Sequence, residues 1–531
     1  MARSELVIAL VGPVGADLNG AAQLVVLQLG RVGYTVDPTI SLSSLLDSVE
    51  RETPLPKAGG GPLNEYISER QNAGSDLREK CGRGDVLALL AVAEIARRRV
   101  KYQRAQGIED ATEPPQAVGH VLRSLKHPKE VETLRKIYGE RFVLVGVLLP
   151  REKRIARLSE LIAQSRGEAE ASEGRVLALE VAAVDESEDR NLGQQMRDTF
   201  ALADVYVDMS DDGEPRRELE RFFDVLFGDP FVSPTRSEYA MSQAFTAGLR
   251  SVDLSRQVGA AITTENADVL AVGCNEVPAY GGGAYWAGDT PDGRDFAQGG
   301  DPNAKLRRVL MDQVRAALIQ RGVLNEASAP SEVNFREALK DTRLDDLTEF
   351  GRVVHAEMHA MLDAARRGVS TKGAMLYRTT FPCHNCAKHI VAAGIREVRY
   401  IAPYPKSLAE DLHPESIVVE PHGPTTRRVR FVPFKGISPA IYGTLFVKTG
   451  KRRNEDGTPI VFDPRASDPK LVREGDVAYL ERERLALTDL ETTIRRCGIR
   501  LLEGALAPPE PLGGSREIES DGTEGVPGSG S

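Results

Sequence analysis

The first 230 residues alternate apolar runs with charged segments of helical pattern. "ELVIALVG" is a continuous apolar run that ends in glycine, and "NGAAQLVVLQLGRVG" follows it with apolar residues at helical spacing. Two later runs, "FVLVGVLLP" and "ADVYVDM", are separated from each other by charged helical segments such as "REKRIARLSELIAQ". Apolar strands that alternate with amphipathic helices are typical of a doubly wound, mostly parallel sheet. The pattern therefore predicts an α/β domain over residues 1–232.

A second α/β pattern begins after the turn-rich stretch "GDPFVSPTRSE" at 228–238. "QVGAAITTENADVLAVGCNEV" reads as two strands around a polar turn, and "HAEMHAMLDAARRG" as a helix closed by glycine. The strand "AMLYRTT", the helix "CHNCAKHIVAAG" and the strand "VRYIAPY" follow. We predict a second domain over residues 233–505, with an insertion at about 278–349. The Pro/Gly/Ser/Glu-rich tail at 506–531 is predicted to be disordered, because it has almost no apolar residues.

Composition narrows the classes of function. The chain has 531 residues, of which 41% are hydrophobic and 27% charged, which is ordinary globular composition. The formal net charge of -10 argues against non-specific binding of nucleic acid, where Lys and Arg must neutralise phosphates. The 5 cysteines do not form a disulfide framework, so we expect a reducing cytoplasm. No run of 18 apolar residues occurs, and we therefore predict no membrane span.

The stretch "TTFPCHNCAKH" holds four potential metal ligands: Cys383, His384, Cys386 and His389. On a helix, Cys383 and Cys386 share one face at i, i+3, whereas His384 points away from that face. His389 would lie about one turn further along, behind the metal. A closed structural zinc site within this stretch is therefore geometrically awkward.

A better third ligand lies upstream, where "HAEMHA" places His355 at the start of a predicted helix. Pro382 marks the start of the cysteine helix, as proline tends to do. Two helix N-termini can then converge on one metal, with His355 on one and the two cysteines on the other. Three protein ligands and an open fourth position are the catalytic arrangement for zinc. Both N-termini also direct partial positive charge towards that position.

The complete pattern, H-x-E followed by P-C-x-x-C, is the signature of zinc-dependent nucleobase deaminases. This chain matches it with "HAE" and "PCHNC". The match predicts one catalytic Zn²⁺ per chain, held by His355, Cys383 and Cys386, with Glu357 as the general acid and base. A rival pattern is the i, i+4 pair His355 and His359, the ligand spacing of H-E-x-x-H proteases. Glutamate stands third rather than second here, so we interpret His359 as a packed or exposed helix residue.

The order of the motifs resembles the deoxycytidylate deaminase branch of the cytidine deaminase superfamily. "RQVGAAI", "VGCNEVP", "HAE", "TTFPCHNCAKHIVAAGI" and "VRYIAPYPKSLAEDL" follow that branch over roughly residues 235–450. With its N-terminal domain, the chain resembles the two-domain anti-phage dCTP deaminases. "SEYAMSQAFTAGLRSVDLSRQVGA" and "FVPFKGISPAIYGTLF" look like that family as well. The resemblance implies a cytidine-deaminase-like α/β/α second domain and a degenerate P-loop-kinase-like first domain with a regulatory role.

The same resemblance implies an activity, partners and substrate contacts. The expected reaction converts dCTP, and also dCMP, to uracil nucleotides, which starves phage replication. The expected partners are the free nucleotide, further copies of the chain, and a regulatory small RNA or phage-derived trigger. By resemblance, Asn275 would hydrogen-bond the deoxyribose and the backbone of Ala356 would face the base. Arg256 is a candidate phosphate contact, with a surface arginine as the alternative, and Trp286 either covers the nucleotide or packs.

The loop "GPVGADLN" at 12–19 occupies the place of a P-loop between the first strand and the first helix. A working loop, G-x-x-x-x-G-K-[ST], ends in glycine, lysine and Ser/Thr, but Asp17, Leu18 and Asn19 stand there instead. We therefore expect no ATP hydrolysis. Nucleotide binding at Gly12 and Gly15 stays open.

Three other functions stay open from the sequence. A housekeeping dCMP deaminase shares the zinc signature. A polynucleotide deaminase acting on tRNA adenosine shares it too, although the acidic composition argues against this function. A non-catalytic nucleotide sensor would keep a structural zinc, but it would have no use for Glu357.

Overall fold

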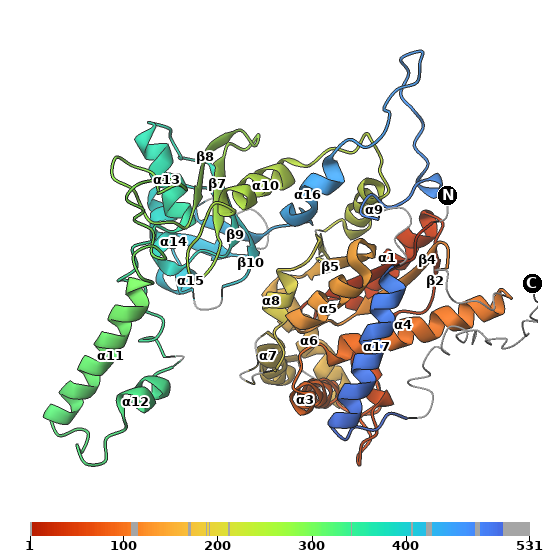
Figure 1. The fold of residues 1–531 in the computed structure, drawn as a ribbon, viewed down its shortest axis with the longest axis horizontal. Coiled ribbons are helices and arrows are strands. Elements are labelled where there is room, and N and C mark those ends of the chain that lie inside the picture. Colours follow the sequence, from red (N-terminus) through yellow and green to blue (C-terminus); the bar gives the residue numbers. More distant parts are fainter. Residues whose placement is uncertain are drawn as a thin grey trace, which may run out of the picture.

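The computed structural model describes residues 3–107, 115–167, 171–186, 188, 190, 192–210, 213–340, 342–404, 407–420, 427–472 and 478–502. The predicted disordered tail at 506–531 lies outside these residues. Two β-sheets organise the chain, each with helices on both faces (Figure 1). Among the described helices, none is long and apolar enough to cross a membrane.

The first sheet is parallel except at one edge. Its order is β13-β6-β5-β1-β4-β2, and β3 also pairs with β4. Only β13 runs antiparallel to its neighbour. The strands are β1 (Leu6–Val11), β2 (Thr35–Val36), β3 (Ile40–Ser41), β4 (Val118–Arg123), β5 (Phe142–Leu148), β6 (Val205–Asp208) and β13 (Gly436–Ile437).

Strand β1 shows why this sheet is covered on both faces. All six of its residues are buried, and successive side chains enter opposite cores. Leu6, Ile8 and Leu10 join the core formed with α1 (Leu18–Arg31) and α9 (Pro215–Leu226). The alternate residues join the core formed with α4 (Val86–Ala105) and α5 (Pro128–Tyr138). The predicted doubly wound sheet is confirmed.

Three of the remaining helices of this part pack together. Helices α6 and α7 pack against each other, and α3 contacts both. The elements are α2 (Leu42–Leu45), η1 (Leu46–Ser48), α3 (Leu63–Cys81), η2 (Gly139–Arg141), α6 (Arg151–Arg166), α7 (Ala171–Glu186) and α8 (Met196–Phe200).

The second sheet has the order β11-β12-β10-β9-β7-β8, in which β7 and β8 run antiparallel to their neighbours. Its strands are β7 (Gly259–Thr263), β8 (Val269–Cys274), β9 (Met375–Thr380), β10 (Glu397–Ala402), β11 (Ile417–Val419) and β12 (Val429–Pro433). Helix α10 (Arg236–Gly248) covers one face, whereas α13 (Ala356–Arg366) and α14 (His384–Ala392) share a core with the other. The short α15 (Ala409–Leu412) packs on α14 and β11. The expected α/β/α arrangement is confirmed.

The insertion forms an arm that projects from the second sheet (Figure 1). It contains α11 (Pro302–Gln320) and α12 (Glu332–Ala338), which pack on each other. Met311 is the only buried residue of α11 among those described, and α12 has none. The arm therefore adds no core to the deaminase-like sheet.

The end of the described chain packs differently from the prediction, which assigned residues 233–505 to the second domain. Strand β13 pairs with β6, and α17 (Ala478–Arg496) packs on α4 and α5 of the first sheet (Figure 1). Between them lie α16 (Pro439–Phe446) and η3 (Pro464–Ala466). The physical reason is a buried polar cluster in which Arg99 donates to Glu483 at 2.9 Å and Tyr479 donates to Glu5 at 2.6 Å. Residues of α17 thus complete the core of the first sheet.

A buried carboxylate joins the two sheets. Glu238 on α10 is 0% exposed and accepts from both terminal nitrogens of Arg221, at 2.8 and 2.7 Å, on α9. It also accepts from the backbone N–H groups of Thr235 and Ile437. One side chain therefore caps α10, pairs with α9 and anchors β13, which fixes the position of α10 under the second sheet.

Candidate metal centre

Two helix N-termini meet at the carboxyl end of the second sheet's central strands. His355 is the N-cap of α13 and Cys383 is the N-cap of α14, and both have extended backbone conformations. Cys386 lies one turn into α14 and is buried. Each N-cap residue leaves its side chain free of capping bonds to its own helix. The structure thus brings together the three residues that the sequence predicts as zinc ligands.

The donor atoms have the spacing of a tetrahedral metal site. The Sγ atoms of Cys383 and Cys386 each lie 3.3 Å from Nδ1 of His355. One ligand atom from each of these residues and from Glu357 lies within 4.8 Å of all the others. Zinc binds Cys sulfur at about 2.3 Å and His nitrogen at about 2.0 Å, which places tetrahedral donors roughly 3.5 Å apart. The two thiols and the imidazole therefore fit zinc, and the borderline-soft donor set suits it chemically.

Electrostatics favour a thiolate at this position. The hydrogen bond from the Cys386 thiol, together with His355, lowers the pKa of Cys383 to about 3 despite burial. The same contact with Cys383 raises the pKa of His355 above its ordinary value. The thiolate is the form of cysteine that binds metal. The chain thus supplies an anionic sulfur ligand.

Glu357 lies beside these ligands, with one oxygen engaged and one free. Its side chain is 0% exposed, and Oε1 accepts a hydrogen bond from Nη1 of Arg378. Oε2 is buried and has no hydrogen-bond partner among the described residues. A buried carboxylate oxygen without a donor is costly unless a ligand, water or ion occupies its neighbourhood. The geometry therefore leaves Oε2 available for chemistry next to the metal ligands.

Arg378 was missed by reasoning from the sequence. It lies in β9, and its side chain is only 7% exposed. The available signal was a charged residue within "AMLYRTT", a strand that otherwise reads as apolar before its two threonines. Buried arginines need a partner, and here the partner is the carboxylate of the H-x-E motif.

The other histidines of the two motifs lie outside the cluster of donor atoms. His384 and His389 do not belong to it, and His389 is exposed. His359 is buried, and its Nδ1 lies 2.9 Å from the carbonyl oxygen of Cys274. The interpretation of His359 as a packed helix residue is confirmed, and the protease-like histidine pair does not converge on a metal.

The residues predicted to contact the substrate differ in burial: Asn275 and Ala356 are buried, and Arg256 is exposed. The amide of Asn275 bridges two backbone groups, accepting from Val258 N at 2.7 Å and donating to the carbonyl oxygen of Arg256 at 2.6 Å. The Arg256 side chain is exposed, with its guanidinium carbon 5.8 Å from the ring centre of Tyr404. Ala356 is fully buried at the first turn of α13. Asn275 therefore holds the segment before β7 in place, and its contact with a sugar stays a prediction.

Trp286 and the N-terminal glycines lie outside the metal cluster. Trp286 is 60% exposed in the insertion, and the guanidinium carbon of Arg250 lies 3.5 Å from its ring centre. Gly12 and Gly15 belong to the loop after β1 of the first sheet. Gly15 has φ +87°, and a Cβ atom there would lie 2.8 Å from the carbonyl oxygen of Arg154. This glycine is therefore required by close packing on α6.

Known proteins share this central part of the chain. Residues 234–402 match the family model described as "Cytidine and deoxycytidylate deaminase zinc-binding region". ComE operon protein 2 of Bacillus subtilis is 47% identical over 53 residues, which are 10% of this chain and 28% of that protein. Deoxycytidylate deaminase of Homo sapiens is 27% identical over 165 residues, 31% of this chain and 64% of that protein. The chain thus spans less than two thirds of the length of these relatives.

Among solved structures, the dCMP deaminase from the cyanophage S-TIM5 aligns with 38% of this chain and with 100% of its own length. The alignment has 17% sequence identity and a TM-score of 0.21. The family match includes the helix starts that carry His355, Cys383 and Cys386. Residues 234–402 are therefore similar to the zinc-binding region of cytidine and deoxycytidylate deaminases.

Proposed function

We propose that this protein hydrolyses the 4-amino group of free deoxycytidine nucleotides, dCTP and also dCMP, and releases ammonia. The observation that carries the proposal is the cluster of His355, Cys383 and Cys386 with the unpartnered, buried Oε2 of Glu357 beside it. A purely structural zinc site has no need of a fourth, protonatable group with a buried oxygen that makes no bond to the described chain. The similarity to deoxycytidylate deaminases supports a cytosine nucleotide as the substrate.

The chain's own residues divide the chemistry between them. His355, Cys383 and Cys386 would hold Zn²⁺, and when bound the metal would supply a Lewis acid that lowers the pKa of a water molecule towards neutrality. Glu357 accepts a proton from the attacking water and delivers it to N3 of cytosine, while the water oxygen adds to C4. Glu357 then transfers the second proton to the amino group, which leaves as ammonia and gives uracil. Atoms balance, because one water is consumed for each ammonia released.

Arg378 is a positioning residue in this scheme. Its guanidinium occupies Oε1 of Glu357, which leaves Oε2 as the oxygen that can accept and donate the proton. Its positive charge also stabilises the ionised carboxylate in a buried site. The N-termini of α13 and α14 add partial positive charge at the same place.

A free nucleotide suits this chain better than a polynucleotide. The formal net charge is -10, whereas polynucleotide binding relies on many basic contacts to phosphate. A free nucleotide also requires no base flipping. We further propose that the reaction depletes dCTP in bacterial defence against phages, which rests on the resemblance of the whole two-domain chain to the dCTP deaminases.

The test is ammonia release from dCTP, dCMP, cytidine and adenosine, measured side by side with the purified full chain. We expect turnover of dCTP and dCMP and none of adenosine. Turnover of dCMP alone would reduce the proposal to a dCMP deaminase. Release of ammonia from tRNA adenosine, with no reaction of any free cytosine nucleotide, would overturn it.

A further inference from the structure

A second cavity lies in the N-terminal part of the chain, among the loop after β1, α3 and α6. Its volume is about 330 Å³, within the range of small-molecule sites. It opens at the carboxyl ends of the parallel strands β1 and β4, where Val11 and Arg123 are the last residues. Ligands of open α/β sheets bind outside the carboxyl ends of the strands. Nothing in the deaminase chemistry uses this cavity.

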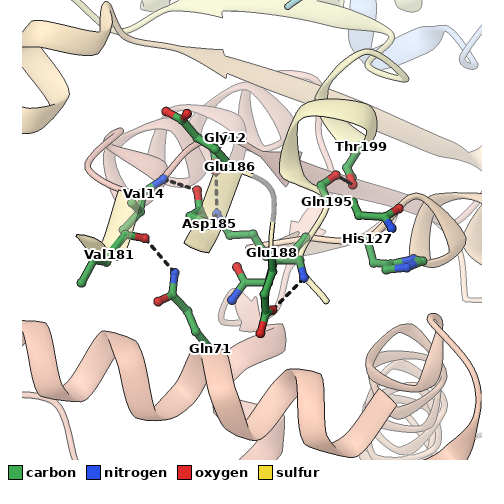
Figure 2. A network of polar contacts seen from close by, with 12 residues as sticks. Gly12, Val14, Gln71, His127, Val181, Asp185, Glu186, Glu188, Gln195 and Thr199 are labelled. Carbon is green, nitrogen blue, oxygen red and sulfur yellow. Dashed lines mark hydrogen bonds and ion pairs between the residues drawn. The ribbon is translucent and has the colours of Figure 1, made fainter. Parts of the chain in front are cut away.

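The lining of this cavity is rich in cations. Five basic side chains face two carboxylates, those of Asp17 and Asp185; the basic residues are Arg70, Arg78, Arg123, Lys126 and Arg157. The carboxylates are already matched, because Lys126 lies 2.6 Å from Asp185 and Arg157 lies 3.3 Å from Asp17. Figure 2 shows Asp185 beneath the loop, where it accepts from Val14 N at 2.7 Å. Arg70 pairs with Asp47 at 2.8 Å and Arg78 with Glu130 at 3.2 Å, so Arg123 is the lining cation that has no ion pair with a described residue.

Arg78 is a buried side chain of this cavity whose guanidinium has donors that no described residue accepts. Its side chain is 2% exposed, and Nη2 pairs with Glu130 at 3.2 Å. Its Nε and Nη1 atoms are buried and have no hydrogen-bond partner among the described residues. Buried guanidinium N–H groups without acceptors are costly. An anion in the cavity would supply those acceptors.

Arg123 points to the same ligand from strand β4. Its side chain is partly buried, and its guanidinium forms no hydrogen bond or ion pair with any described residue. Burial lowers the pKa of its guanidinium, which reflects a desolvated and uncompensated charge. Two arginines from different elements thus offer free donors to one cavity, and forked guanidinium donors match phosphate oxygens.

The loop itself is not built to hold the phosphate. Asp17 caps α1 by accepting from Gly20 N at 3.1 Å; it stands where a P-loop has its last glycine, and Leu18 stands where a P-loop has lysine. The carbonyl oxygen of Gly12 accepts from Lys126 at 2.8 Å, and Gly15 packs tightly on α6. Apolar and aromatic residues also line the cavity, with Leu63, Tyr66, Ile67 and Leu161 among them. The cavity therefore offers both cations for a phosphate and an apolar surface for a flat base.

We propose that this cavity binds one nucleoside mono- or diphosphate, with its phosphate on Arg78 and Arg123 and its base against Tyr66 and Ile67. The site binds without hydrolysis, because Asp17 and Leu18 replace the last glycine and the lysine of a working loop. A cavity at the small end of the ligand range has room for one nucleotide. The inference is independent of the deaminase proposal, since it rests on different residues.

The experiment is isothermal titration calorimetry of the full chain with ADP. The base of ADP is adenine, whereas the proposed substrate of the metal centre contains cytosine. We expect saturable binding at one site per chain that weakens as NaCl rises. Arg123→Gln removes a charge without breaking any contact between described residues, and should weaken ADP binding about 10-fold or more. Arg495→Gln is the matched control, because Arg495 is 78% exposed on α17. This control should bind ADP as the wild type does.

Three results would overturn the proposal. The first is that neither ADP nor AMP binds at millimolar concentration, and the second is that Arg123→Gln binds ADP with unchanged affinity. The third is that pyrophosphate binds as tightly as ADP, which would show that the site does not contact the base. The proposal would also be contradicted if a single-stranded RNA oligonucleotide bound at lower concentration than ADP and if Arg123→Gln abolished that binding. Arg78→Lys keeps the charge beside Glu130, and it should fold and still lose affinity because the guanidinium fork is gone.

Discussion

Arg378→Met tests whether Arg378 positions the carboxylate of Glu357. The substitution keeps an unbranched side chain in β9 and removes the guanidinium that donates to Oε1. Both partners are buried, at 7% and 0% side-chain exposure, so water cannot readily replace the bond. A hydrogen bond to a charged group contributes about 1.5–3 kcal/mol. At 1.36 kcal/mol for each tenfold in rate, kcat for deamination should fall about 10- to 150-fold.

The assay is steady-state ammonia release from dCTP, with zinc content and thermal unfolding measured on the same preparations. KM should change less than kcat, because Arg378 contacts the acid–base residue and not the nucleotide. Arg378→Lys should recover part of the lost kcat, since an ammonium can still donate to Oε1. A wild-type kcat in Arg378→Met, with zinc bound, would refute the reasoning. A loss of zinc in Arg378→Lys would show a structural role instead.

Three further predictions concern other parts of the chain. Burial raises the pKa of Glu5, but Arg99, His120 and Tyr479 outweigh burial and lower it to about 2 from 4.5. Because its pKa is lower in the folded state, the ionised Glu5 adds about 3 kcal/mol to the free energy of unfolding above pH 4.5, and this contribution is lost as the pH falls towards 2. In urea unfolding, the difference in free energy of unfolding between wild type and Glu5→Gln should therefore shrink from pH 6 to pH 3. Asn275→Ala should lower turnover and cost about 1–3 kcal/mol of stability while zinc remains bound in metal analysis, since its amide bridges Val258 and Arg256. The full chain should release no phosphate from ATP in a phosphate assay, because Asp17 is committed to capping α1; phosphate release that persists in Glu357→Gln would contradict this.

The metal centre could be predicted from the sequence because its chemistry depends on local spacing. His355 and Glu357 lie two residues apart, Cys383 and Cys386 three apart, and each pair begins a helix whose start is marked in the sequence. Helix geometry then fixes which side chains share a face, which excludes His384. Arg378 was not predicted, because its partner is 21 residues away and only the packing of β9 against α13 brings them together.

The boundary of the second domain could not be predicted for a similar reason. Residues 436–502 follow the deaminase motifs along the chain, and the sequence alone does not show on which sheet the amphipathic helix α17 packs. The structure selects the first sheet through buried partners far away in sequence, Glu483 with Arg99 and Tyr479 with Glu5. The unpaired guanidinium donors of Arg78 and Arg123 in the N-terminal cavity were also missed, because a sequence shows charges and not which donors lack a partner.

The most direct test of the central claim compares wild type and Glu357→Gln for zinc content and for ammonia release from dCTP. Glutamine keeps the shape of Glu357 but cannot accept a proton. The account predicts about one zinc per chain in both proteins and a rate lower by roughly 10²–10⁴-fold in the variant. Cys386→Ala is the matched control, which should lose zinc and activity together. Near wild-type deamination by Glu357→Gln, or loss of its zinc, would contradict the assignment of Glu357 as the acid–base residue beside a catalytic metal.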